Sequence, residues 1–282
     1  MSNIKLFVCC HQNMPMPDHE LLVPVQVGAA LADEHFALFR YDDAGENISG
    51  KNRSYCELTA QYWAWKNEEA DYYGFFHYRR FLYPDIREKR LYRIMAEPTE
   101  ALLEKLGYGS FAELIGQHDL IAPKGENMWV PVREHYAAAP HHFGRDLQIA
   151  EQIVRERHPD MIPAMETYLS GTVAYFGNLY IMKKDLFHEY CAWLFPILEE
   201  FDRRVDISGY SAQEKRVNGY LAERLFGIYL THVRAKLRVL ELPRVHFQKD
   251  RKARMKQRLI AALLPPGSRQ RAWVKAKAKG LN

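Results

Sequence analysis

The stretch "ADYYGFFHYRRF", residues 70–81, is an apolar run that ends in a cluster of basic side chains. Its first half is aromatic and uncharged after Asp71, which is typical of a strand buried on both faces of a sheet. Its second half, residues 77–80, places an imidazole, a phenol and two guanidiniums where that strand should end. Ligands of open α/β sheets bind beyond the carboxyl ends of strands, and guanidiniums suit phosphate. We therefore interpret residues 77–80 as part of a binding site; the alternative is a solvated strand exit.

Strand and helix patterns alternate on both sides of this stretch. Tyr55, Leu58, Tyr62 and Trp65 fall at helical spacing in a helix that should end near Asn67. Further strands are expected at 4–11, 118–125 and, as a pair or one bent strand, at 171–182; further helices are expected at 144–157, 183–201 and 213–230. Strands mixed with helices from residue 4 onward predict an α/β layer architecture.

Composition limits the classes of protein that the chain can belong to. Its 282 residues suit one large domain, or one domain with a small appendage. No apolar run approaches the roughly 18 residues of a membrane-spanning helix, and we interpret the first twelve residues as a strand, not a signal peptide. The cysteines have no metal-ligand spacing, so a reducing, cytoplasmic setting is the simplest expectation. They are Cys9, Cys10, Cys56 and Cys191.

The basic charge is concentrated at the C-terminus. Residues 249–282 hold eleven Lys and Arg but one acidic residue, whereas the preceding chain holds 28 basic and 34 acidic residues. We therefore divide the chain into a body, 1–248, and a basic amphipathic tail, 249–282. The tail has an apolar centre at 259–264, and Trp273 lies among basic residues, so we expect it to hold the protein on an anionic membrane surface. A disordered solubilising tail is the alternative. Nucleic-acid binding is disfavoured by the acidic body.

Polar residues outside the opening stretch add further site candidates. The loop 41–54 supplies Asp42, Asp43, Asn47, Ser49 and Asn52, which could bond a ribose, base or sugar, although a turn-rich connector is the simpler interpretation. Ser54 and Glu57 have capping-box spacing, which favours Glu57 as a helix cap over a catalytic role.

The expected helix 213–230 carries an arginine on its apolar face. Arg224 falls inside the apolar stripe and Glu223 falls at its edge. A guanidinium there needs an anion or a carboxylate, so a ligand and an internal ion pair are both open. Asn178 is likewise a polar residue within an apolar strand.

Four blocks of the sequence resemble a known bacterial family. "NISGKNRSYCELTAQYWAWKN", "DYYGFFHYRRF", "GNLYIMKKDLFHEYCAWLFPIL" and "YLAERLFGIYL" occur in the order of the polysaccharide-biosynthesis domains once of unknown function and later identified as galactofuranosyltransferases. The resemblance covers about residues 4–245. It implies a GT-A-like α/β fold with a mixed central sheet flanked by helices. It also implies transfer of a sugar, galactofuranose, from a UDP-linked donor to a lipid-linked or nascent glycan of capsule or O-antigen type.

The resemblance also assigns roles to the candidate residues. GT-A folds hold a metal on the donor diphosphate through a D-x-D motif after a central strand; this chain has no D-x-D, and "HYRR" stands at the equivalent place. We therefore expect no metal or other cofactor, with His77, Arg79 and Arg80 neutralising the diphosphate and Glu223 or another carboxylate as general base. A non-catalytic nucleotide-sugar or glycan-binding module is the alternative. Donor contacts are expected from His11, Asp42, Asp43, Asn47, Ser49, Asn52, Tyr78, Asn178 and Arg224.

Overall fold

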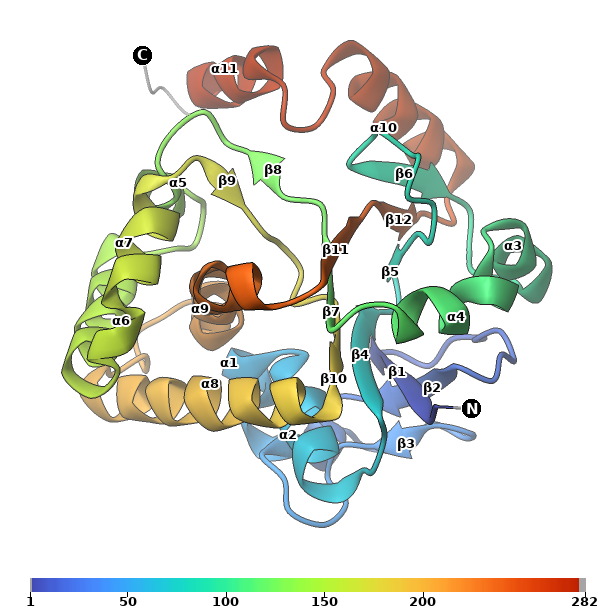
Figure 1. Ribbon diagram of the computed structural model, residues 1–282, viewed down its shortest axis with the longest axis horizontal. Coiled ribbons are helices and arrows are strands. Elements are labelled where there is room, and N and C mark those ends of the chain that lie inside the picture. Colours follow the sequence, from blue (N-terminus) through green and yellow to red (C-terminus); the bar gives the residue numbers. More distant parts are fainter. Residues whose placement is uncertain (1, 279–282) are drawn as a thin grey trace.

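A computed structural model describes residues 2–278 and shows one mixed sheet with helices on both faces (Figure 1). The main path of the sheet runs β11-β7-β10-β4-β1-β2-β3. Its strands are β1 (Ile4–Cys10), β2 (Leu22–Gln26), β3 (Arg40–Tyr41), β4 (Tyr72–His77), β7 (Leu120–Pro123), β10 (Tyr180–Lys183) and β11 (Val239–Leu242). β10 runs antiparallel to both of its neighbours, and the other pairs on this path are parallel. The predicted α/β fold, a mixed central sheet flanked by helices, is confirmed.

The remaining strands extend the sheet beyond β4. β5 (Arg80–Leu82) pairs with β4 and with β12 (Arg244–Phe247), which also pairs with β6 (Tyr92–Met95). A separate pair is made by β8 (Glu126–Asn127) and β9 (Val173–Ala174). The predicted strand region 171–182 is therefore two strands, β9 and β10, joined by a turn.

The helices cover two faces of the sheet. In Figure 1, α6 to α9 lie on one side of the strands and α3 and α4 on the other. Their bounds are α1 (Asn52–Tyr55), α2 (Leu58–Asn67), α3 (Glu100–Lys105), α4 (Phe111–Gly116), α5 (Val132–Ala137), α6 (Gly144–Arg157), α7 (Ile162–Ser170), α8 (Lys184–Arg204), α9 (Val217–Val233), α10 (Arg251–Leu263) and α11 (Arg269–Ala278). The prediction of a helix at 144–157 and of one ending at Asn67 is confirmed.

β4 is buried on both faces, as its sequence predicts. Successive side chains of a strand point to opposite faces. Accordingly Tyr73 and Phe75 pack in the core beneath α2, α8 and α9, whereas Tyr72 and Phe76 pack in the second core with α3 and α4. His77 continues the first set, so its ring is directed toward the side of the sheet that carries α9.

The strand order reverses between β1 and β4. From β1 the chain passes to β2 and β3 on one side, and then returns to place β4 on the other side of β1. A crevice forms at such a switch point because the connections leave the two strand ends in opposite directions. The carboxyl ends of β1 and β4 are Cys10 and His77, so the fold itself selects the place that the sequence singled out.

The predicted capping box at Ser54 and Glu57 is wrong. Ser54 lies inside α1, and α2 begins at Leu58 without a side-chain cap. The Ser54 hydroxyl accepts a bond from Asn218 at 3.1 Å, and the Glu57 carboxylate accepts one from Asn178 at 2.9 Å. Both side chains are thus used in tertiary contacts, which a local spacing rule cannot show.

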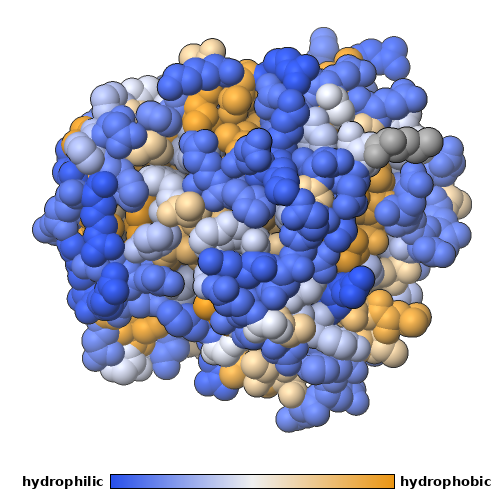
Figure 2. All heavy atoms as spheres, turned by 60° about the horizontal axis from the view of Figure 1, so that its bottom comes forward, coloured by the Kyte–Doolittle hydropathy of each residue, from blue (hydrophilic) through white to orange (hydrophobic). Residues whose placement is uncertain are grey.

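The surface is mostly polar on the face drawn in Figure 2, where apolar patches are separated by hydrophilic side chains. Within residues 2–278, no helix has both the length and the apolar character that crossing a bilayer requires.

Candidate active site

Two adjoining cavities open at the switch point. The first, called here the basic cavity, has a volume of about 630 Å³, and the second, the carboxylate cavity, about 310 Å³. Five residues line both and form their shared wall: Cys56, Glu57, His77, Arg79 and Arg216. The basic cavity is completed by Cys9, His11, Val27, Asn52, Arg53, Ala212 and Lys215. The carboxylate cavity is completed by Arg80, His135, Ala139, His142, Phe176, Gly219, Tyr220, Glu223 and Arg224.

The basic cavity is built from the carboxyl ends of β1, β2 and β4. His11 follows β1, Val27 follows β2, and His77 ends β4. Its lining includes four permanently cationic side chains against one carboxylate, that of Glu57: Arg53, Arg79, Lys215 and Arg216. Such an excess of positive charge in a crevice favours an anionic ligand with more than one charge.

His77 is neutral in this environment. Burial first, and then the charges of Arg80 and Arg79, lower its pKa to about 2. Its Nδ1 accepts a hydrogen bond from the backbone N–H of Arg79 at 3.1 Å, so the ring proton is on Nε2. A neutral His77 can donate a hydrogen bond but contributes no charge, which narrows the predicted charge-neutralising role to Arg79 and Arg80.

One turn holds both carboxylates of the carboxylate cavity. The backbone N–H of Gly177 donates to Glu223 Oε1 at 2.6 Å, and the side-chain amide of Asn178 donates to Glu57 Oε1 at 2.9 Å. Both turn residues have positive φ, 96° and 47°. A non-glycine residue in this region is strained, and such strain is common where a side chain must be aimed at a site. The turn between β9 and β10 therefore fixes the spacing of Glu57 and Glu223.

Burial in the shared wall raises the pKa values of Glu57 and Cys56. Burial raises the pKa of the Glu57 carboxyl, the Asn178 amide opposes this shift, and the negative charge of Glu223 adds to it. Burial also raises the pKa of the Cys56 thiol to about 12, although Arg216 Nε lies 3.3 Å from its sulfur. A thiol with that pKa is not a nucleophile at neutral pH. The wall thus offers a carboxyl with raised proton affinity and two guanidiniums, but no thiolate.

Arg224 is buried and incompletely bonded. Its side chain is almost wholly enclosed, yet its two hydrogen bonds, from Nη1 to the Tyr175 carbonyl and to Glu223, are both 3.4 Å long. Its Nε has no partner. Rings of Phe176 and Tyr136 lie 5.0 and 5.6 Å from its guanidinium carbon. Buried charged groups normally find full partners, whereas Arg224 lines the carboxylate cavity with only two long bonds, so its guanidinium is suited to a ligand oxygen there.

The predicted site residues fall into two groups. His11, Asn52, His77, Arg79, Arg80, Glu223 and Arg224 line one or both cavities. The others do not line either cavity: Asp42, Asp43, Asn47, Ser49, Tyr78 and Asn178. Asn178 still touches the site through Glu57, and the Tyr78 hydroxyl lies 3.3 Å from His11 Nε2.

The loop residues have partners inside the fold. The buried Asp42 carboxylate accepts hydrogen bonds from the backbone of Gly28 and Ala29 and from the Ser49 hydroxyl. Asn47 donates to the carbonyls of Asp43 and Gly45 within its own turn. These contacts shape the end of β2 beside the basic cavity, and the Asp42 carboxylate is wholly buried among them.

Sequence reasoning missed Arg216, Lys215, Arg53 and the role of Glu57. Arg216 precedes α9 by one residue and reaches the wall from there. The signal that could have found it is a basic pair, "KR", immediately before a helix whose face already carried Arg224. Within residues 2–278, no three His, Cys, Asp or Glu side chains are grouped to hold a metal ion.

Comparison with known protein families identifies the family of this chain. A family model described as "Domain of unknown function (DUF4422)" matches residues 5–235. The chain belongs to the DUF4422 family.

A solved structure places this DUF4422 chain beside a glycosyltransferase. The structure titled "WbbM bifunctional glycosytransferase apo structure" matches with a TM-score of 0.83 and 33% sequence identity. The match covers 87% of the DUF4422 chain but 45% of the WbbM chain. The DUF4422 chain therefore resembles one part of a bifunctional protein, and the family is related to glycosyltransferases. No curated protein matches the chain.

Proposed function

We propose that this DUF4422 protein is a glycosyltransferase that moves a hexose from a UDP-sugar to a glycan acceptor. The observation that carries the proposal is the pair of cavities at the β1/β4 switch point. The basic cavity has four cationic side chains against one carboxylate and suits a diphosphate, whereas the carboxylate cavity has four arginines against two carboxylates, adds Glu223, and suits an acceptor hydroxyl. Their shared wall is where the transferred sugar must lie, because it alone contacts both.

The cations of the basic cavity provide the binding energy for the donor. Arg79 and Arg216 lie on the shared wall, where the bond between the sugar and the diphosphate is broken, and Lys215 lies further into the basic cavity. As that bond breaks, its electron pair passes to the departing UDP oxygen. Guanidiniums already in place stabilise the developing charge without rearrangement. The Nε2–H of His77 can donate to the same oxygens.

Glu223 is the base in this proposal. It lines the carboxylate cavity and not the basic cavity, so it is on the acceptor side of the wall. It takes the proton of the acceptor hydroxyl as that oxygen bonds to the anomeric carbon. Glu57, on the wall with a raised pKa, is placed to bond a hydroxyl of the transferred sugar. Arg224 orients Glu223, and its guanidinium lines the same cavity beside the acceptor.

The resemblance of the four sequence blocks supports a finer proposal. The donor is UDP-galactofuranose, the acceptor is a lipid-linked or nascent surface polysaccharide such as capsule or O-antigen, and no divalent metal takes part. The structural match to a bifunctional glycosyltransferase supports the class of reaction, and the missing D-x-D motif supports the metal-free route.

The proposal is tested by a panel of UDP-sugars. A donor that binds the native state raises the melting temperature by mass action, and UDP-galactofuranose should give the largest increase. Adding an acceptor glycan should then release UDP. Protection without UDP release across a panel of acceptors would instead identify a nucleotide-sugar-binding module, and no protection by any UDP-sugar would contradict the proposal.

Metal independence has its own test. Turnover measured after exhaustive treatment with EDTA should equal turnover before it, because cationic side chains stand where a metal would be. Loss of turnover that magnesium or manganese restores would show the metal-free route to be wrong.

A further inference from the structure

The C-terminal helices carry an exposed surface that is both apolar and basic. In α10, Met255, Leu259 and Leu263 are spaced four residues apart, so they follow one side of the helix. They are 60%, 61% and 69% exposed. Lys252 and Lys256, also exposed, lie three residues before Met255 and Leu259 and so belong to the same side. We call these five residues the tail face.

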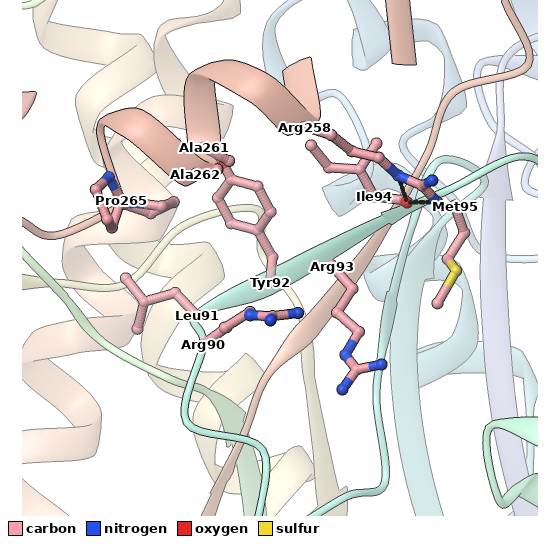
Figure 3. A pocket seen from close by; sticks show the side chains of 11 residues that line it. Arg90, Leu91, Tyr92, Arg93, Ile94, Met95, Arg258, Ala261, Ala262 and Pro265 are labelled. Atoms are coloured by element: carbon pink, nitrogen blue, oxygen red, sulfur yellow. Dashed lines mark hydrogen bonds between the residues drawn. The ribbon is translucent and has the colours of Figure 1, made fainter. Parts of the chain in front are cut away.

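A second side of α10 is fixed to the body. Arg258 donates from Nε and Nη2 to the carbonyl of Ile94 in β6, at 2.9 and 2.6 Å (Figure 3). Asp250 caps the helix by accepting from the N–H of Ala253 at 2.6 Å. In Figure 3 the ring of Tyr92 extends from β6 toward Ala261 and Ala262. Because this side is anchored, the tail face is held outward.

The turn after α10 and the helix that follows add aromatic groups. Trp273 of α11 is 58% exposed, and the Lys277 ammonium lies 4.3 Å from its ring centre. Trp129, in the body, donates from its indole N–H to the carbonyl of Gly267 at 2.8 Å and is itself 47% exposed. Amphipathic indoles beside basic residues are typical of surfaces that insert into the headgroup region of a bilayer.

Charge selects the partner of this surface. From residue 249 onward the chain has eleven basic residues and one acidic residue, whereas the rest of the chain has more acidic than basic residues. A symmetric dimer through this face would place two such cationic surfaces together, which is unfavourable. A nucleic acid would complement the positive charge of the tail face, but it would offer no apolar surface to the leucine and methionine side chains. We propose that the tail face and Trp273 bind an anionic lipid bilayer, with α10 lying in the plane of the interface. Residues 279–282 of the tail lie outside the described part of the chain.

The inference does not depend on the proposed activity, and vesicle sedimentation of the full chain tests it. The protein should sediment with vesicles of phosphatidylcholine and phosphatidylglycerol, and only weakly with phosphatidylcholine alone. The variant Met255→Gln/Leu259→Gln/Leu263→Gln should lower the partition coefficient for anionic vesicles at least tenfold. Circular dichroism should show the same fold, because all three side chains are exposed.

A matched control separates the tail face from exposed apolar residues in general. Leu38 and Ile86, in the body, are 97% and 63% exposed, and Leu38→Gln/Ile86→Gln should leave vesicle binding unchanged. Equal sedimentation of the triple variant and the parent protein would overturn the proposal. Equal binding of the parent protein to neutral and anionic vesicles would also overturn it. So would a parent protein that does not bind vesicles but either forms a dimer that the triple variant disrupts or binds duplex DNA.

Discussion

Two buried polar groups, Asp42 and Arg224, differ in how completely the fold satisfies them. The Asp42 carboxylate is wholly buried and accepts three hydrogen bonds of 2.5–3.0 Å. The Arg224 guanidinium is equally buried but makes two bonds of 3.4 Å and leaves Nε without a partner. A fully bonded group stabilises the native state alone, whereas an incompletely bonded one beside a cavity retains capacity for a ligand. The number and length of its hydrogen bonds thus distinguish a structural polar residue from a site residue, which amino-acid composition cannot do.

The largest effect expected on the site side of this comparison comes from Glu223→Gln. Glutamine keeps the size of the side chain and can still accept from the Gly177 N–H, but it cannot take a proton. Turnover should fall about 10²–10⁴-fold, the usual contribution of a general base, with little change in the melting temperature. UDP release assays measure this, and Glu113→Gln on the surface of α4 is the control. Turnover within about threefold of the parent would remove Glu223 as the base.

For the fully bonded residue of the comparison, Asp42→Ala should mainly lower the free energy of unfolding. It leaves the N–H groups of Gly28 and Ala29 and the Ser49 hydroxyl without their partner. At about 1–3 kcal/mol for each unsatisfied buried group, a loss of about 3 kcal/mol or more in the free energy of unfolding is expected. Asp43→Ala, which loses only the half-exposed contact with His35, should cost about 1 kcal/mol or less. Denaturant titration measures both. If the Asp42→Ala protein is as stable as the parent but binds UDP more weakly, Asp42 is a donor-binding residue and not a structural one.

Arg79→Ala and Arg216→Ala should each weaken UDP binding. A charged hydrogen bond to phosphate contributes about 1.5–3 kcal/mol, which corresponds to roughly a 10- to 100-fold increase in Kd. Arg87→Ala, which removes an exposed arginine outside both cavities, should leave Kd unchanged. Calorimetry with UDP measures the effect. If all three variants bind UDP alike, the basic cavity is not the diphosphate site.

A smaller effect, on the pH dependence of the free energy of unfolding, is expected from His77. Its folded pKa, about 2, is far below its ordinary value near 6.5. The unfolded chain therefore binds a proton that the native state does not, and native stability falls as pH drops below about 6.5, by up to about 1.4 kcal/mol per unit. His77→Asn should make the stability curve flatter between pH 6.5 and 5. An unchanged slope would mean that folding does not lower the pKa of His77.

Local sequence patterns predicted the fold well because the main elements have strong periodic signals. β1, β4 and α6 were expected from apolar runs and helical spacing, and the stripe on α9 placed Arg224 correctly in the interior. The carboxyl end of β4 was recognised because charge follows directly on a run of aromatic residues.

The rest of the site depends on contacts between distant residues. Glu57 matched a capping box, but its partner Asn178 is 121 residues away. Asp42 lay in a polar loop that suited a ligand, whereas its partners are mainly backbone N–H groups, which leave no pattern in a sequence. Arg216 reaches the wall only because the start of α9 packs against α1, which brings its side chain to Cys56. Such pairings follow from topology, and topology is not contained in any single window of residues.

The turn at Gly177 and Asn178 has a practical consequence for engineering. One residue positions Glu223 and the next positions Glu57, and a Cβ at position 177 would lie 2.4 Å from Leu179. The positions of Glu57 and Glu223 therefore depend on the same turn, and a change in the turn would move both carboxylates. An engineer who wants a new donor or acceptor should leave this turn intact and vary the outer lining instead, at Arg53, Lys215 or Tyr220, where one contact can change without displacing the other acid.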